Sequence, residues 1–369
     1  MVLDIVFYSF TTIIAIQLIY YLGVFMPFVA AKPKPEAPKN IPVSIIICCK
    51  NEADNLKQNL PYIIEQDYRD FEIILIDDYS KDDTLEIMKS FKDKHQNIKV
   101  VEVKPIDAFW GNKKYALTLG IKAATHNFLL FTDADCTPNS KQWISKMTRY
   151  FSNEKSMVLG YGAYKKRKYS LLNKLIRYET LLAAIQYFSF AKIGMPYMGV
   201  GRNLAYRKEL FFNASGFMNH MNIRSGDDDL FVNQVATKTN VALSYETDSF
   251  TLTEGKTSLI SWFNQKRRHV STAKHYKTLH KFSLSLFYIT QLLLWVSLII
   301  LLSAQFQLII VLCLFGLRIL SQSIVIHKGS KRFNERDLLL LFPFLELFLV
   351  LFQMAIFITN QISKPVHWK

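Results

Sequence analysis

Three long stretches with almost no charge constrain this chain more than any other feature. Residues 5–31 contain no charged side chain, residues 282–326 contain only Arg318, and residues 338–362 contain only Glu346. A helix of about 20 apolar residues is enough to cross a bilayer. The three stretches therefore predict one N-terminal span, a hairpin of two spans, and a further apolar helix near the C-terminus.

These stretches separate the membrane part of the chain from one domain of ordinary soluble composition. The expected order is an N-terminal transmembrane helix (1–31), an α/β domain with interfacial helices (32–281), a transmembrane hairpin (282–326), a basic loop (327–337), and a C-terminal transmembrane or re-entrant helix with its tail (338–369). The last segment stays open because Pro343 and Glu346 interrupt it. A signal peptide is disfavoured for the first segment, which is long and has neither a basic start nor a small-residue cleavage site.

Positive charge is concentrated beside the expected spans. The formal net charge is +15, and the basic sequences AKPKPEAPKN, KRRHVSTAKHYKTLHK and HKGSKRFNER all adjoin apolar stretches. The positive-inside rule places these three regions on the cytoplasmic side of a cell (inner) membrane. Attraction to anionic headgroups explains such residues better than nucleic-acid binding does. We therefore expect a multi-pass protein with a cytoplasmic domain and no nucleic-acid partner.

A short strand followed by two carboxylates is the clearest candidate for a site. Residues 128–132 (FLLFT) are apolar or β-prone and lead directly into Asp133-Ala134-Asp135. Open α/β sheets bind ligands where their strands end. Carboxylates at this spacing suit a hard divalent cation, Mg²⁺ or Mn²⁺, that is also held by phosphate oxygens. The alternative is a capped turn, because Asp after a strand often caps the next helix.

Strands and helices alternate through the first half of the domain. Strands are expected at 43–49, 72–77, 98–103 and 128–132, with helices from about 54 to 65, after 84, and over 113–124. This alternation predicts an α/β fold with a doubly wound sheet of nucleotide-binding type. The chain has no G-x-G-x-x-G and no G-K-[ST], which argues against a dinucleotide enzyme and a P-loop NTPase.

Four motifs at successive strand ends resemble inverting glycosyltransferase family 2, which has the GT-A fold. They are CCKNEADNL, IDDYSKDDT, GNKKYALTLGIKAA and FTDADCTP, and the resemblance covers roughly residues 42–281. It implies that Asp77 and Asp78 bind the uracil or ribose of a nucleotide sugar, and that Asp133 and Asp135 hold nucleotide and metal. For Asp77 and Asp78, a helix-capping turn is the alternative.

Further basic residues are candidates for donor contacts. Lys113 and Lys114 precede a helix and either meet the diphosphate as point charges or are solvated. The resemblance makes Arg202 and Asn203 plausible sugar or phosphate contacts. The apolar segment 171–194 reads equally well as an interfacial helix or as a core helix.

Three consecutive acids, Asp227, Asp228 and Asp229, open a later helix. Inverting transfer needs a base that removes the proton of the acceptor hydroxyl. The family pattern E-D-x-[DE] implies that Asp227 is this base, with Asp228 as the runner-up if the register is off by one. An acidic helix cap is the bland alternative.

Gln265, Arg268 and His269 would share one face of a helix near the end of the domain. Related membrane enzymes carry Q-x-x-R-W here, and the resemblance implies that the Gln and Arg help to hold diphosphate and acceptor. This chain has His269 in place of the Trp, which makes long-chain polymerisation less favoured. The tail ISKPVHWK resembles a shortened form of the W-[KR]-G-R ending of lipid-directed members.

Together these features predict a membrane-anchored inverting glycosyltransferase with a cytoplasmic GT-A domain. Its expected donor is a UDP-linked sugar, its cofactor Mg²⁺ or Mn²⁺, and its acceptor a lipid or lipid-linked glycan. A processive polysaccharide synthase is the enzymatic alternative. A non-catalytic scaffold that binds nucleotide sugars is the alternative of another class.

Overall fold

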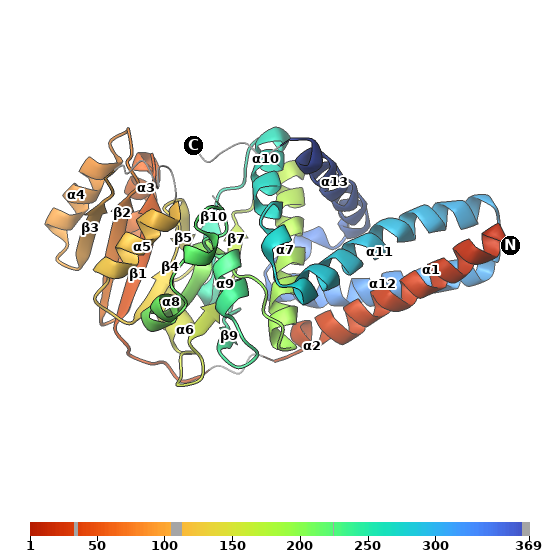
Figure 1. The fold of residues 1–369 in the computed structure, drawn as a ribbon, viewed down its shortest axis with the longest axis horizontal. Coiled ribbons are helices and arrows are strands. Elements are labelled where there is room, and N and C mark those ends of the chain that lie inside the picture. The colour runs from red at the N-terminus through yellow and green to blue at the C-terminus, as the bar shows by residue number, and fades with distance from the viewer. Residues whose placement is uncertain (33–35, 105–112, 224, 364–369) are drawn as a thin grey trace.

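The computed structural model describes residues 1–32, 36–104, 113–223 and 225–363. The first two positions of the GNKKYALTLGIKAA motif (111–112) and most of the ISKPVHWK tail (364–369) lie outside these ranges. An α/β domain occupies one end of the molecule and a bundle of long helices the other, with helix α7 (Leu171–Lys192) between them (Figure 1).

The domain is built on a seven-stranded mixed sheet with the order β3-β2-β1-β4-β8-β6-β9. The strands in that order are Ile98–Glu102, Phe71–Asp77, Val43–Cys49, Phe128–Phe131, Leu204–Arg207, Met157–Leu159 and Val241–Leu243. The first four run parallel, and β8 is antiparallel to both of its neighbours. A second sheet of order β5-β10-β7 contains Cys136–Pro138, Thr251–Thr253 and Gly162–Tyr164.

Helices cover both faces of the large sheet, which confirms the predicted doubly wound arrangement. One face packs against α3 (Ala53–Ile64), α4 (Thr84–Lys94) and α6 (Trp143–Thr148). The other packs against α5 (Lys113–Ala123) and, further along the sheet, α7, α8 (Lys208–Asn213) and α9 (Asp229–Val235). The central strands are apolar on both faces because both faces are buried.

The predicted strands and helices of this region are confirmed to within one or two residues. Strand β1 has its predicted limits, and the other three predicted strands are shifted by a single residue at one end. Strands β1 and β4 are apolar runs bounded by polar residues, a pattern in which the limits of the strand can be read directly.

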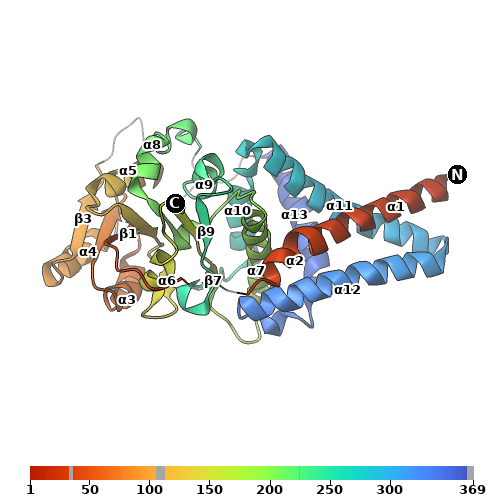
Figure 2. The same ribbon diagram turned by 90° about the horizontal axis from the view of Figure 1, so that it is seen from below.

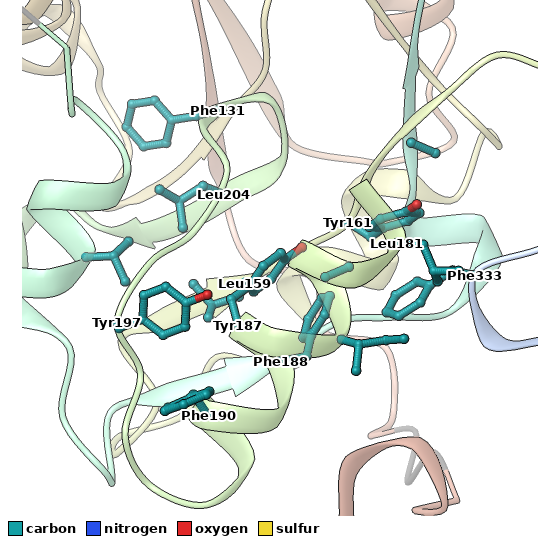
Figure 3. Packing of buried hydrophobic residues seen from close by; sticks show 14 of the residues in the cluster. Phe131, Leu159, Tyr161, Leu181, Tyr187, Phe188, Phe190, Tyr197, Leu204 and Phe333 are labelled. Atoms are coloured by element: carbon teal, nitrogen blue, oxygen red, sulfur yellow. The ribbon is translucent and has the colours of Figure 1, made fainter. Parts of the chain in front are cut away.

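Helix α7 is a buried core helix rather than one lying on the membrane surface. Thirteen of its 22 residues are buried. Phe188 stacks on Phe333 at 5.6 Å between ring centroids, and Tyr187 donates a hydrogen bond to the carbonyl of Gly160 at 2.7 Å (Figure 3). Of the two predicted roles for this segment, the core helix is the one observed.

The helical bundle holds four described helices that are long and apolar enough to cross a membrane. They are residues Val2–Val29, which comprise α1 (Val2–Leu18), a π-helical stretch (Ile19–Phe25) and α2 (Met26–Val29), then α11 (Thr278–Ser303), α12 (Leu308–Arg332) and α13 (Phe342–Ile362). The N-terminus and the α11–α12 turn lie at the end away from the domain (Figures 1 and 2). Helix α10 (Leu259–Val270) joins domain and bundle beside α7 and α13.

Candidate functional site

The candidate site lies where the strand order of the sheet reverses. Strand β1 pairs with β2 on one side and with β4 on the other, and Ile46 stands opposite Phe131. A crevice forms at the carboxyl ends of strands at such a switch point. The recess found here is lined by residues from β1, α5, the end of β4, the Gly201 turn with the strand β8 that follows it, and the start of α9. Five segments far apart in sequence therefore supply one site.

Asp133, Asp135 and Cys136 form a cluster that suits a divalent cation. One ligand atom of each lies within 4.8 Å of the others. Burial raises the pKa of the Cys136 thiol, which keeps it protonated and donating to Asp135 Oδ1 at 3.3 Å. The two carboxylates are thus the available anionic ligands, and hard oxygen ligands match Mg²⁺ or Mn²⁺.

The loop that carries these carboxylates is anchored to helix α3. Asn59 on α3 donates a hydrogen bond to the carbonyl of Ala134 at 2.9 Å. Ala134 is buried, whereas Asp133 is partly exposed and Asp135 is exposed. The residue between the two acids anchors the turn, so both carboxylates face outward toward a ligand.

Lys113 joins the two halves of the site. Its Nζ lies 3.0 Å from Asp133 Oδ1 and 3.4 Å from Asp227 Oδ2. Its side chain is only 18% exposed, so these ion pairs form largely away from water. The prediction placed Lys113 near the donor, and the structure puts it between the carboxylate after β4 and the acid before α9.

Asp227 faces the recess and is the one of the three consecutive acids that pairs with Lys113. Burial raises its pKa, but Lys113, with Lys114 beyond it, outweighs burial and leaves the pKa below its usual value. Gly226 precedes it with φ +89°, and a Cβ there would come within 2.5 Å of Leu230. A glycine is thus required to turn the chain so that Asp227 points into the site.

The two acids that follow have other partners. The carboxylate of Asp228 caps α9: it accepts a hydrogen bond from the N–H of Asp229, the first residue of that helix, at 2.7 Å. It also accepts one from Gly201 N–H at 2.7 Å. Burial and the two neighbouring acids raise its pKa to about 7. Asp229 is buried and accepts from the hydroxyls of Thr272 at 2.5 Å and Tyr276 at 2.6 Å. Both therefore brace the turn that presents Asp227.

Asp77 and Asp78 stand at the end of β2, beside the end of β1. Asp77 accepts from Ser80 N–H at 3.3 Å, as a turn-forming residue does. Asp78 is buried, with Lys50 Nζ 3.6 Å from its Oδ2. Burial raises the pKa of both carboxyls. The predicted nucleotide contact thus fits Asp78 better than Asp77, whose carboxylate shapes the turn.

Lys114 differs from its predicted place at the diphosphate. It is fully buried, and its Nζ donates to the carbonyls of His220 at 2.8 Å and Ile223 at 2.7 Å. Burial lowers its pKa to about 8. Its contacts fasten α5 to the loop that precedes Asp227, which is a positioning role.

Arg202 and Asn203 also have structural partners. Arg202 lies over the ring of Tyr164 and donates to the carbonyl of Gly162 at 2.7 Å. Asn203 is fully buried and accepts from the indole N–H of Trp143 at 3.0 Å. Asn203 therefore holds the sheet together and is not open to a sugar, contrary to the expected contact.

Helix α10 carries Gln265, Arg268 and His269, as predicted. Burial lowers the pKa of Arg268 while Asp227 opposes that shift, so the guanidinium lies within electrostatic range of this acid. Gln265 Oε1 is buried and has no hydrogen-bond partner among the described residues. His269 is exposed on the same helix. Gln265 thus offers a hydrogen-bond acceptor and Arg268 a positive charge for contact with a ligand.

Two contributors were not singled out from the sequence. Lys50 directly follows β1, and its position at a strand end was the available signal. Asn59 lies within a helix, where nothing in the sequence distinguishes it from a surface amide.

Comparison with known proteins finds similarity to glycosyltransferases over about half of the chain. Residues 44–221 match the family model Glycosyl transferase family 2. The chain is 29% identical over 187 residues to the probable glycosyltransferase YdaM of Bacillus subtilis, covering 47% of this chain and 44% of that protein. It is 27% identical over 146 residues to a poly-beta-1,6-N-acetyl-D-glucosamine synthase of Staphylococcus epidermidis, covering 39% and 34%. The similarity thus spans less than half the length of either relative.

A solved structure resembles nearly the whole chain. It is mannosyltransferase PcManGT from Pyrobaculum calidifontis in complex with GDP-Man and Mn²⁺, with a TM-score of 0.60 and 18% identity. The match covers 92% of this chain and 96% of that one. It agrees with the predicted GT-A fold with flanking apolar helices.

Proposed function

We propose that the protein belongs to glycosyl transferase family 2, whose model residues 44–221 match. It would transfer a sugar from a nucleotide-sugar donor to an acceptor hydroxyl with inversion at the anomeric carbon. The expected donor is a UDP-sugar, and the expected acceptor is a lipid or a lipid-linked glycan. The protein would work at the inner cell membrane with its α/β domain in the cytoplasm.

One observation carries this proposal. The Lys113 ammonium group lies between Asp133, at the end of β4, and Asp227, at the start of α9. A donor diphosphate needs positive charge, and an acceptor hydroxyl needs a carboxylate base. In the recess, Lys113 supplies the positive charge and Asp227, its partner in one of the two ion pairs, supplies the carboxylate.

The reaction would be a single displacement. Asp227 would take the proton of the acceptor hydroxyl, whose oxygen forms a bond to the anomeric carbon from the face opposite the diphosphate. The bond between that carbon and the diphosphate oxygen breaks, and the nucleotide diphosphate leaves with the electron pair. Lys113 would turn to the donor phosphates, which frees Asp227 as a base, and Arg268 adds positive charge near the leaving group.

Asp133 and Asp135 would hold the divalent cation. When bound, Mg²⁺ or Mn²⁺ supplies charge neutralisation for the departing diphosphate. Asp78, at the end of β2, would contact the nucleoside.

The surface of α10 supports a lipid acceptor. Leu259 is 48% exposed and Ile260 is 74% exposed, about one and a half turns before Gln265 on the same helix. Exposed apolar side chains beside a cluster of apolar helices suit contact with lipid. An acceptor dissolved in the membrane would thus reach the site along α10.

The test is a transfer assay with the full-length protein in detergent, extracted membrane lipid, and a panel of radiolabelled UDP- and GDP-sugars. We expect lipid-extractable product that carries one sugar with the anomeric configuration opposite to that of the donor. Retained configuration would contradict single displacement, and long-chain product would instead support the processive synthase. Nucleotide binding without transfer to any acceptor would favour the scaffold.

A further inference from the structure

Helix α13 is long and apolar enough to span a bilayer, yet it lies beside only the domain-proximal half of the bundle (Figures 1 and 2). In its second turn, Glu346 accepts from Gln291 Nε2 at 3.2 Å and pairs with Arg318. Gln291 lies halfway along α11, and Arg318 lies near the middle of α12. The start of α13 is therefore level with the middle of the two spanning helices.

The other end of α13 returns to the α/β domain. Arg267 on α10 donates from Nε to Asn360 Oδ1 at 2.9 Å and from Nη2 to the carbonyl of Ser363 at 2.7 Å. Asn360 Nδ2 donates back to the carbonyl of Arg267 at 3.1 Å. Midway, Trp262 of α10 stacks on Phe352 with ring centroids 4.3 Å apart. A helix of 21 residues is roughly 32 Å long. Helix α13 therefore extends from the middle of the bundle to α10.

The segment before α13 is tied to the same side. Glu335 and Asp337 both pair with Arg177 of α7, and Arg177 and Glu335 are each only 2% exposed. Lys166 lies 3.0 Å from Asp337. Both flanks of α13 are therefore fastened to the α/β domain.

The charged pair gives a reason for the depth of α13. Arg318 is the only charged residue in 282–326 and Glu346 the only one in 338–362. An unpaired charge in a bilayer is costly, and a paired, hydrogen-bonded one is much less so. Arg318 also donates to Gln322 Oε1 at 2.5 Å. To pair with Arg318, Glu346 must lie at the middle of the bundle. The segments before and after α13, however, are both held at the α/β domain.

We propose that α13 is a re-entrant helix that enters from the side of the α/β domain and returns to hold α10, so the chain crosses the membrane three times. The C-terminus then lies on the same side as the domain, in agreement with the two lysines in the final sequence KPVHWK. Asn360 becomes a positioning residue that acts through Arg267 on the α10 face bearing Gln265 and Arg268. This last step rests on the proposed function, whereas the topology does not.

Topology is tested by labelling full-length protein in intact cells with a membrane-impermeant maleimide. Three single changes, Lys369→Cys, Lys331→Cys and Ala304→Cys, are placed in a Cys313→Ala background. Lys331 is exposed in the last turn of α12 on the domain side, and Ala304 is exposed in the turn at the far end. Lys369→Cys should react as Lys331→Cys does, before and after permeabilisation. Reaction like that of Ala304→Cys would show a fourth crossing and overturn the proposal, whether or not the protein is a transferase.

The positioning role is tested by steady-state kinetics. Asn360→Ala should lower kcat about tenfold, the effect of losing one hydrogen bond to a charged group, and leave the KM for the donor within about twofold. Asn360→Asp keeps the acceptor for Arg267 and should restore most of kcat. Thr359→Ala is the matched control, since that hydroxyl bonds to Ala355 of its own helix. Equal kcat in Asn360→Ala and the control, or equal loss in Asn360→Ala and Asn360→Asp, would overturn the role.

Discussion

Replacing Asp227 with Asn separates the base from the residues that brace it. The change keeps the volume of the side chain but removes its ability to accept a proton. A positioned base is worth roughly 10² to 10⁴ in rate, so kcat should fall by that factor, or about 3 to 5 kcal/mol in activation free energy. Lys113 loses a partner at 3.4 Å but keeps Asp133 at 3.0 Å. Donor affinity should therefore stay the same or rise slightly.

The assay is steady-state transfer, together with nucleotide titration of the same preparation. Asp228→Asn serves as the control, because Asp228 caps α9 and binds Gly201 rather than facing Lys113. A larger loss of kcat in Asp228→Asn at unchanged melting temperature would refute the assignment of the base. A loss of donor affinity in Asp227→Asn that matches the loss of kcat would refute the reasoning about Lys113.

Three further changes probe the surroundings. Asp78→Ala should weaken nucleotide binding about tenfold in a titration while leaving the melting temperature nearly unchanged, since the residue lies at a strand end. Asp229→Asn should lower the melting temperature by roughly 5 to 10 °C in a thermal scan, because Thr272 and Tyr276 lose a buried carboxylate acceptor. Lys114 has a pKa lowered by burial to about 8, so the folded protein releases this proton before the unfolded chain does, and stability should rise between about pH 8 and 10 relative to Lys114→Met.

Each of these has a contradicting result. Unchanged affinity for both UDP and GDP in Asp78→Ala would remove its nucleotide role. A melting temperature of Asp229→Asn within a degree of the wild type would show that its buried contacts contribute little. A stability difference between wild type and Lys114→Met that does not change with pH would mean that this lysine keeps an ordinary pKa.

The sheet could be predicted closely because its information is local. The apolar runs at 43–49 and 128–131 are bounded by polar residues, so their pattern reports both the strand and its limits. The depth of helix α13 could not be predicted in this way, because its apolar stretch has the same length whether the helix crosses the membrane or is re-entrant. Its depth depends on Glu346 meeting Arg318 on another helix.

The site could be predicted as a set of strand ends but not side chain by side chain. Lys113 and Lys114 are adjacent in sequence, yet one faces Asp133 and the other two backbone carbonyls of the loop at 220–223. Similarly, Asp227 and Asp229 are two residues apart, but only Asp229 accepts a hydrogen bond from Tyr276, which is distant in sequence. The direction of a side chain at the start of a helix depends on such partners, and the sequence does not report them.

The measurement that tests the central claim most directly is calorimetric titration of UDP and GDP into the full-length protein, with and without Mn²⁺, compared with Asp135→Ala. Asp135 is an exposed strand-end carboxylate, so its removal should leave the fold intact. We predict that Mn²⁺ strengthens the binding of at least one nucleotide by tenfold or more, a gain on the order of 1.4 kcal/mol, and that this gain disappears in Asp135→Ala. Nucleotide affinity that is the same with and without Mn²⁺, or a gain that Asp135→Ala retains in full, would contradict a metal-dependent donor site at the end of β4.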